Sequence, residues 1–284
     1  MSIALVTDST SDIEPQRAAA LGVTVVPLFV VFGDRSFRDY LDLSRPQFFE
    51  MLANEKTLPT TSQPTAQMFE DAFRPLVEAG RDILCITISS HLSGTINAAR
   101  AAAAQFPDAK IEIYDSQSAA GGLGMMVMRA REVIDGGGGW PEVLAALDHE
   151  RETQRLYACL SDLSHVQRTG RIGRAQAVLG TLMKIVPVLS LKDGVVEAQA
   201  QVRTFARAQA TMLDLSLAAV TDVGKARFLV MHTNAPHLAE GAMEQLRARL
   251  GGARPRMLDI LEAGPVIAVH GGPGAVGIFV AQDA

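Results

Sequence analysis

The chain has 284 residues, of which 48% are hydrophobic and 20% are charged, and its formal net charge is −5. This composition is typical of a folded protein rather than a disordered chain, and the length favours two domains. The basic residues are scattered and do not form the Lys/Arg stripe that binds a phosphate backbone, which argues against a nucleic-acid partner.

The apolar runs are too short for a membrane-spanning helix, which needs about 20 residues. The best of them, residues 23–32, is interrupted by Pro27. The first residues contain no basic segment or cleavage site, and Cys85 and Cys159 each lie inside an apolar run, as buried reduced thiols do. We therefore expect a cytoplasmic protein without stable membrane insertion.

The first half of the chain alternates short apolar runs with helical patterns, which is typical of parallel strands joined by helices. Residues 3–6 are the first predicted strand. In the segment that follows, Ser11 and Glu14 have the spacing of a capping box and Pro15 suits a first helical turn. Gly22 then ends this predicted helix.

A hairpin is predicted after the first helix. Residues 23–32 and 36–40 flank the pair Gly33-Asp34, which is a weaker turn signal than Asn-Gly. Ser44 and Gln47 have the spacing of a second capping box and predict the start of another helix.

Prolines bracket residues 59–65 and push the residues before them toward extended geometry, so we predict a rigid loop there. A helix with an apolar face over residues 68–77 follows and is expected to end at Gly80. Residues 83–88 and 111–114 are the next predicted strands, and each leads into a segment rich in hydroxyl groups.

The clearest break in composition is the glycine run at residues 136–139, which precedes a last predicted helix at 141–151. We place the domain boundary near residue 153. Residues 1–152 are predicted to form an N-terminal Rossmann-like α/β domain, with a mainly parallel sheet and helices on both faces. Residues 153–284 are predicted to form a C-terminal α/β domain.

The sheet of the C-terminal domain is predicted to be mixed and partly antiparallel, because Lys192-Asp193-Gly194 reads as a hairpin turn. Helices are predicted at residues 204–219 and 236–250. The predicted strands are residues 156–160, 186–191, 195–198, 227–232, 257–260, 266–270 and 276–280.

Four segments of the chain are rich in Ser and Thr: residues 7–11, 60–62, 89–93 and 116–118. Loops that follow parallel strands meet at one edge of the sheet, where ligands bind in open α/β folds. Helix capping explains some of these hydroxyl groups but not their number at one edge. None of the segments contains Lys or Arg, so their neutral donors favour a single carboxylate over a phosphate-rich ligand.

The sequence signatures of cofactors and metals are missing. There is no Gly-x-x-x-x-Gly-Lys-Ser/Thr motif, and residues 122–127 lack the third glycine of a dinucleotide fingerprint. His232 and His237 do not have the spacing of two metal ligands on one helix face. His149 and His165 are interpreted as surface or capping residues. We therefore expect neither a cofactor nor a metal.

His270 ends an apolar run and leads into the turn Gly271-Gly272-Pro273-Gly274, where backbone can approach a ligand closely. Together with Ser93 it also suggests a hydrolase. However, Ser93 lies in Leu92-Ser93-Gly94 rather than in a Gly-x-Ser-x-Gly elbow, and no third member of a catalytic triad is evident.

With these motifs in order along nearly the whole chain, the sequence resembles the DegV family, the fatty-acid-binding subunit of bacterial fatty acid kinase. One such motif alone would be a weak signal, whereas the set is specific. The matching segments are Val6-Thr7-Asp8-Ser9-Thr10-Ser11-Asp12, Thr60-Thr61-Ser62-Gln63-Pro64, Ile88-Ser89-Ser90, Leu92-Ser93-Gly94-Thr95, Asp115-Ser116, Gly170-Arg171-Ile172, Asp193-Gly194, and His270 with Gly272-Pro273-Gly274.

The resemblance implies a lipid-binding carrier that is not itself an enzyme. It implies that a long-chain, palmitate-like fatty acid of about C14–C18 is buried at and beneath the interface of the two domains. By the same resemblance, Thr61, Ser93 and His270 hold the carboxylate. A separate ATP-binding kinase subunit, docked in part through Arg171, phosphorylates that carboxylate to an acyl phosphate for phospholipid metabolism. The residues implied to support the head-group site are Ser62, Gly94, Thr95 and Gly272.

The chain departs from the family pattern at three positions. Gly271 stands where Thr is common, Ala120 where Ser is common, and Val186 where Lys often precedes Pro. The first two departures are expected to alter hydrogen bonds to the head group. Arg168 and Arg174 flank Arg171, so a docking role could be shared among the three or could be a plain surface cluster.

Two rival functions remain open at this point. The first is an enzyme that uses Ser93 and His270: either a hydrolase, or a small-carbonyl phosphotransferase in which His270 binds a carbonyl covalently, since dihydroxyacetone kinases resemble this fold. The second is a regulatory interaction protein, which would show neither a bound ligand nor turnover.

Overall fold

The computed structural model describes residues 3–55, 57–178 and 185–284. It divides into two compact units, and the division does not follow the chain strictly. The first unit contains Met1–Arg151 together with Gly264–Val266, and the second contains Glu152–Ala263 and Ile267–Ala284. Within the described ranges, no helix combines the length and the apolar character that a membrane crossing requires.

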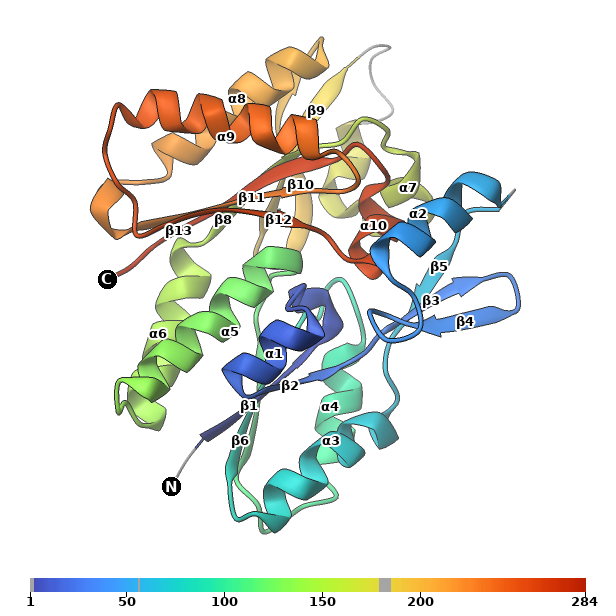
Figure 1. The fold of residues 1–284 in the computed structure, drawn as a ribbon, viewed down its shortest axis with the longest axis vertical. Helices are drawn as coiled ribbons and strands as arrows, with labels where there is room; N and C mark the ends of the chain where they lie inside the picture. The colour runs from blue at the N-terminus through green and yellow to red at the C-terminus, as the bar shows by residue number, and fades with distance from the viewer. Residues whose placement is uncertain (1–2, 56, 179–184) are drawn as a thin grey trace. The chain divides into compact units, whose positions relative to one another are not determined.

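The first unit is built on a four-stranded parallel sheet in the order β2-β1-β6-β7, of which β1, β2 and β6 are labelled in Figure 1. Its strands are β1 (Ile3–Asp8), β2 (Val23–Val26), β6 (Asp82–Thr87) and β7 (Ile111–Asp115). The helices that connect and cover them are α1 (Pro15–Leu21), α3 (Ala66–Glu78), α4 (Thr95–Ala103), α5 (Ala120–Asp135) and α6 (Trp140–Thr153).

Both faces of this sheet are covered by helices, as predicted. On one face Leu5 and Ile86 pack with Leu123 of α5 and Val143 of α6. On the other face Ala4, Val6, Ile83 and Cys85 pack with residues of α3 and α4, namely Phe69, Phe73, Ala98, Ala99 and Ala102. Burial on both faces explains why the central strands are almost continuously apolar.

A small antiparallel sheet, ordered β4-β3-β5, completes the first unit together with α2 (Arg45–Asn54). The hairpin of β3 (Phe29–Phe32) and β4 (Arg35–Arg38) is confirmed. The single run at residues 23–32 is two strands of different sheets, β2 and β3, because Pro27 has no N–H to donate to a ladder.

The rigid loop predicted at residues 59–65 is partly wrong. Thr60–Ser62 form the strand β5, which pairs with β3 so that Thr61 lies opposite Val30. The extended geometry that proline favours in the residues before it is the geometry of a strand. The sequence therefore predicted the local backbone correctly but not its partner.

The capping box predicted between Ser11 and Glu14 is also wrong. Ser9–Ser11 form a short 3₁₀ helix, η1, which ends at Asp12 with a positive φ of 54°. The helix α1 then begins at Pro15, and the Glu14 carboxylate pairs with Arg45 instead of capping it. The second predicted box is present, since the side chain of Gln47 accepts a hydrogen bond from the Ser44 N–H at 3.1 Å.

The second unit contains a six-stranded mixed sheet in the order β10-β9-β8-β13-β11-β12. Only β11 and β12 pair in parallel among its described strands. The hairpin predicted at Lys192-Asp193-Gly194 joins β9 to β10, and Asp193 and Gly194 both have positive φ, 51° and 76°, as the two central residues of a type I′ turn require. The strands are β8 (Arg155–Cys159), β9 (Val186–Lys192), β10 (Val195–Val202), β11 (Ala226–His232), β12 (Met257–Glu262) and β13 (Val276–Gln282).

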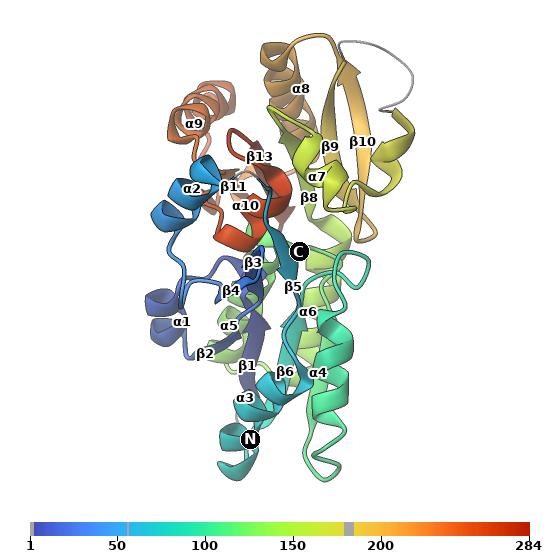
Figure 2. The ribbon, with the colours of Figure 1, turned by 90° about the vertical axis from the view of Figure 1, so that its right-hand side faces the viewer.

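Two long helices cover one face of this sheet, with α8 beside β9 and β10 (Figure 2). Met212 and Leu213 of α8 and Met243 and Leu246 of α9 pack onto strand residues such as Phe228. A smaller cluster joins Leu160 and Leu189 to Val166, Ile172 and Ala175. The long helices are α8 (Phe205–Ala218) and α9 (Pro236–Leu250). The second unit also contains the short helices α7 (Ser164–Arg168), η2 (Gly173–Val178) and η3 (Val223–Lys225).

The strand predicted at residues 266–270 is a helix, α10 (Pro265–Gly271). A short apolar run cannot be assigned to a strand or a buried helix by periodicity alone. Pro265 at the first helical position fixes a φ that suits a helix, so the local signal for a helix was present and was outweighed by the apolar run. His270 therefore lies in the last turn of a helix rather than at the end of a strand.

Candidate functional site

The hydroxyl-rich loops of the first unit meet at the carboxyl edge of its parallel sheet, as predicted. The Ile88 N–H, just after β6, donates to the Asp8 carboxylate at the end of β1 at 2.8 Å. The Ser89 N–H donates to the Ser118 carbonyl at 2.8 Å, which joins the loops after β6 and β7. These bonds tie three successive strand ends into one edge.

Most of the hydroxyl groups at this edge hold the loops in place. Ser9, Ser89 and Ser116 are almost fully buried. The Ser9 Oγ accepts from the Leu28 N–H at 3.0 Å, the Ser89 Oγ from the His91 N–H at 3.2 Å, and the Ser116 Oγ from the Ser118 N–H at 3.0 Å. The turn explanation therefore applies to Ser89 and Ser116, whereas Ser9 holds a backbone group from a later part of the chain.

Ser93 differs from them because it is half-buried and lies just before α4. Its N–H donates to the Ser89 carbonyl at 3.1 Å, which fixes the turn. Its Oγ lies 2.8 Å from the Thr95 Oγ1 and accepts from the Thr95 N–H at 3.3 Å. The Ser93 hydroxyl is thus held at the start of a helix, where free backbone N–H groups favour an anion.

The motif around Thr61 packs against the motif around Ser93. Thr61 is half-buried in β5, between two exposed neighbours. The side chain of Gln63, just after β5, covers Gly94 so closely that a Cβ at Gly94 would lie 2.2 Å from the Gln63 Oε1. The structure therefore brings together two of the predicted site segments within the first unit. Sequence spacing gave no sign of the role of Gln63.

His270 belongs to the second unit and is a neutral imidazole at physiological pH. Burial, the nearby Arg171 guanidinium and the nearby His165 lower the pKa of His270 to about 4. A neutral imidazole carries one N–H donor and one acceptor nitrogen. His270 can therefore donate a hydrogen bond to an anion without forming an ion pair.

The prediction that His165 is a surface or capping residue is wrong. Its side chain is buried, and the Nδ1 lies 3.3 Å from the Val269 carbonyl in α10. A Cβ at Gly272 would lie 2.7 Å from the His165 Cδ2, and Gly272 also has a positive φ of 69°. The ring of His165 thus packs on the backbone that follows His270, and glycine is required there.

Arg171 is exposed in the turn between α7 and η2. Its Nη1 donates to the Thr169 carbonyl at 2.5 Å. Arg168 is exposed as well, whereas Arg174 lies 3.7 Å from the Glu197 carboxylate on β10. Arg171 and Arg168 therefore present positive charge on the surface of the second unit.

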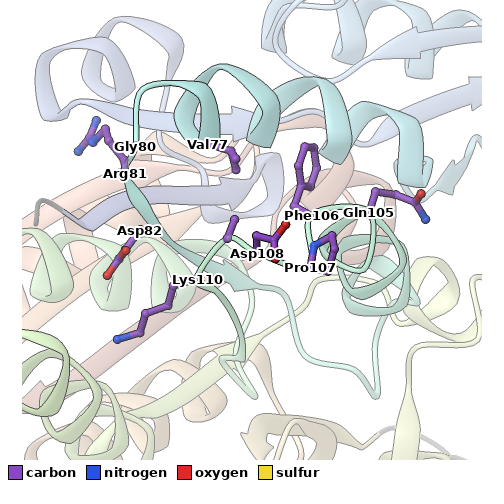
Figure 3. A pocket seen from close by; sticks show the side chains of 10 residues that line it. Val77, Gly80, Arg81, Asp82, Gln105, Phe106, Pro107, Asp108 and Lys110 are labelled. Atoms are coloured by element: carbon purple, nitrogen blue, oxygen red, sulfur yellow. The ribbon is translucent and has the colours of Figure 1, made fainter.

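A pocket of about 410 Å³ lies at the opposite, amino edge of the first unit's parallel sheet (Figure 3). It contains none of the predicted site residues, and ligands of open α/β sheets bind at the carboxyl edge. Across the part of the chain that the structure describes, no three His, Cys, Asp or Glu side chains are grouped so that they could hold a metal ion. The pocket is lined by Val77, Gly80, Arg81, Asp82, Gln105, Phe106, Pro107, Asp108, Ala109 and Lys110.

A family model described as "Uncharacterised protein, DegV family" matches residues 2–283. The chain belongs to the DegV family. Among the DegV domain-containing proteins, one from Deinococcus radiodurans is 36% identical over 278 residues, 98% of each chain. Another, from Halalkalibacterium halodurans, is 34% identical over 277 residues, 97% of each chain.

Several solved structures share this fold over nearly their full length. A fatty-acid-binding DegV family protein from Thermus thermophilus is 35% identical, with a TM-score of 0.92 and coverage of 99% of this chain and 100% of that one. A stearic-acid-binding protein from Eubacterium ventriosum is 26% identical, with a TM-score of 0.90 and coverage of 99% and 98%. The fatty-acid-binding DegV of Bacillus subtilis is 29% identical, with a TM-score of 0.89 and full coverage of both chains. The DegV fold, with one parallel and one mixed sheet, is therefore confirmed.

Proposed function

We propose that this chain binds a long-chain fatty acid and presents its carboxylate to a separate ATP-dependent kinase subunit. The observation that carries the proposal is the likeness, over 99% of the chain with a TM-score of 0.92, to a fatty-acid-binding DegV family protein from Thermus thermophilus. In the proposed reaction, a carboxylate oxygen attacks the γ-phosphorus of ATP in the kinase subunit. The bond from that phosphorus to ADP breaks, and an acyl phosphate and ADP are formed.

Burial of the acyl tail supplies most of the proposed affinity. Each buried methylene contributes about 0.8 kcal/mol, so a sixteen-carbon chain contributes about 11 kcal/mol before the loss of its conformational freedom. Each hydrogen bond to the charged head contributes only about 1.5–3 kcal/mol. The head-group contacts therefore serve mainly to orient the carboxylate.

We infer that the carboxylate is held by Thr61 and Ser93 of the first unit and by His270 of the second. Two observations support the choice: Gln63 links the segments of Thr61 and Ser93, and the imidazole of His270 is neutral. Neutral donors bind a carboxylate without the strong ion pair that would reduce the nucleophilicity of its oxygen. The residues proposed to support the site are Ser62, Gly94, Thr95 and Gly272.

The proposed contact with the kinase subunit involves Arg171. Its exposure and its position beside His270 in the second unit support this role. We expect Arg171→Ala to lower the rate of acyl phosphate formation while fatty-acid affinity stays within about twofold, because the bound head group would keep its hydrogen bonds. Arg174→Ala, at a side chain paired with Glu197, is the matched control.

Mass spectrometry of lipid extracted from the purified protein tests the binding step. We expect a stoichiometric fatty acid of about C14–C18 in the wild type, and an affinity about tenfold to hundredfold weaker in the Ser93→Ala and His270→Ala variants, because each loses one hydrogen bond to the head group but keeps the buried tail. Repeated recovery of lipid-free protein would contradict the proposal. Turnover of esters that depends on Ser93, or a covalent carbonyl adduct on His270, would instead support one of the enzymatic alternatives.

A further inference from the structure

Three aspartate side chains lie buried in the first unit, and none of them belongs to the proposed head-group site. Asp8, Asp12 and Asp39 are 0%, 3% and 1% exposed. Asp8 ends β1, Asp12 follows η1, and Asp39 follows β4. Burial of several acids is expensive unless each has a partner, so their contacts indicate what they do.

Asp12 holds the backbone just before α10. Its Oδ1 accepts from the Gly264 N–H at 2.9 Å and from the Tyr40 hydroxyl at 3.0 Å. The Tyr40 ring also lies against Gly264, where a Cβ would be only 2.5 Å from the tyrosine oxygen. Residue 264 is thus fixed by a carboxylate and an aromatic ring that are more than 200 positions earlier in the chain.

Asp39 faces the next N–H of the same segment, that of Val266. Its own N–H donates to the Leu28 carbonyl at 2.9 Å, which fixes its backbone. Its carboxyl group faces the Ser9 hydroxyl and the Val266 N–H closely enough for both to lower its pKa, although neither reaches the geometry of a full hydrogen bond. Because residue 265 is proline, Asp12 and Asp39 together face the two N–H groups at the start of α10.

The charges that face these acids do not balance when all of them are ionised. Arg45 is the cation that acts on Asp12 and Asp39. Its Nη2 donates to the Tyr40 hydroxyl at 3.1 Å, its guanidinium lies 5.2 Å from the centre of the Tyr40 ring, and it is paired with Glu14. One guanidinium is therefore shared between an exposed glutamate and the buried acids.

The buried acids titrate in the physiological range. Desolvation raises the pKa of Asp8 to about 6, of Asp12 to about 7 and of Asp39 to about 8. The neighbouring charges of Asp8 and Asp12 add to the shifts of Asp12 and Asp39 respectively. Since the folded protein keeps protons that the unfolded chain releases near pH 4, the contribution of these acids to stability falls as the pH rises from about 4 to about 8.

We propose that Asp12 and Asp39 form a proton-dependent latch on Gly264–Val266 that governs whether α10, the helix bearing His270, is ordered from its first turn. The latch is closed when the two carboxyl groups are neutral. It opens when both are ionised, because repulsion between buried charges favours a segment that moves and admits water. On the proposed function, on which this consequence rests, the fatty acid is retained at lower pH and released faster as the pH rises.

Hydrogen exchange tests the latch without any ligand. Between pH 6 and pH 8, the range of the Asp8 to Asp39 pKa values, we expect exchange of the amides in residues 264–270 to increase about tenfold beyond the intrinsic pH effect measured on an unstructured peptide. The double variant Asp12→Asn, Asp39→Asn keeps the shape but not the charge, so its exchange in this segment stays low at both pH values. Asp42→Asn removes an exposed carboxylate paired with Arg38 and serves as the matched control, with the wild-type profile.

The dissociation rate of a fluorescent long-chain fatty acid from delipidated protein tests the consequence. We expect release to be about tenfold faster at pH 8 than at pH 6 in the wild type and in Asp42→Asn, and nearly independent of pH in the double asparagine variant. The pKa of His270, about 4, places its own titration below this window.

These measurements separate the latch from the proposed function. If hydrogen exchange of α10 depends on pH but the protein binds no fatty acid, the latch is supported and the proposed function is contradicted. Tight fatty-acid binding with flat exchange of residues 264–270 overturns the latch and leaves the function. At pH 8 the wild type carries buried charges that the double asparagine variant lacks, so the latch requires the variant to be the more stable of the two. A variant that is less stable than the wild type at pH 8 also overturns the latch.

Discussion

At the scale of single residues, Gly94 shows how a turn is kept free of a side chain. Its φ of −76° suits any residue, so the need for glycine is steric. We expect Gly94→Ala to lower the free energy of unfolding by about 1 kcal/mol, because its Cβ would displace the Gln63 amide from 2.2 Å. In a Gln63→Ala background the same substitution should change stability by close to zero. Chemical denaturation of the four proteins gives the coupling, and additive effects would contradict the contact.

A second residue-scale prediction concerns the imidazole of His270. Because the positive charge of Arg171 opposes its protonation, Arg171→Gln is expected to raise the pKa of His270 from about 4 toward the ordinary value of 6.5. NMR titration of the ring measures this, with Arg168→Gln as the exposed control. The depressed pKa also means that His270 lowers stability as the pH falls below 6.5, since the unfolded chain then binds a proton that the folded protein excludes. An unchanged midpoint in Arg171→Gln would contradict the electrostatic coupling.

Site residues differed in how far the sequence could specify them. Ser93 and Thr61 were proposed because they lie in local segments rich in hydroxyl groups and in motifs that match the family. Gln63, which lies on Gly94, and His165, which lies on Gly272, could not be found, because each acts on a glycine far along the chain. A glycine in the sequence can indicate that another group packs closely on the backbone there, but it does not identify the side chain that does so.

At the scale of elements, α10 is fixed at its start by a contact that no local pattern contains. Gly264→Ala would place a Cβ 2.5 Å from the Tyr40 oxygen and 2.7 Å from its ring carbons. The ring is rigid and is held by Asp12 and Arg45, so we expect the substitution to cost about 1–3 kcal/mol of stability. Gly271→Ala, at the other end of α10, meets only ordinary contacts at 3.7 Å and is the matched control. Thermal unfolding of both variants is the measurement, and equal effects would contradict the prediction.

Elements with a long periodic pattern were predicted well, and short ones were not. The helices α3, α8 and α9 carry an apolar face over several turns, which specifies both their existence and their length. The strand β5 and the helix α10 are too short for periodicity to decide. β5 exists because β3 offers it a partner, and α10 begins where Asp12 accepts the Gly264 N–H. Tertiary contacts, rather than the local sequence, therefore determine that β5 is a strand and that α10 is a helix.

At the scale of the whole molecule, each unit has its own hydrophobic core, and we expect the buried ion pairs of the second unit to affect the stability of that unit alone. In the second unit Asp283 lies 3.1 Å from Arg227 and also pairs with Arg256. Asp283 and Arg227 are 8% and 4% exposed. We expect Asp283→Asn to lower the stability of this unit by about 3 kcal/mol, because Arg227 would keep a buried charge without its carboxylate.

Hydrogen exchange in increasing urea resolves this effect by segment. Protection should fall in β11 and β13 of the second unit and stay unchanged in β1 and β6 of the first. Asp214→Asn, at an exposed carboxylate paired with Arg249, is the matched control. An equal loss of protection in both units would contradict the expectation that they unfold separately.

The fold class was within reach of the sequence because alternating strands and helices, and the hairpin at Asp193-Gly194, are local signals. The contact of Gly264–Val266 with the first unit could not be predicted, because the local sequence gives no sign that these residues lie against Asp12, Asp39 and Tyr40. It has a consequence for synthesis. We expect the first 151 residues to leave the ribosome without the backbone that contacts Asp12 and Tyr40, because that backbone is supplied only once residues 264–266 have been made. A truncated fragment ending at Arg151 should therefore remain incomplete however long it is given to fold.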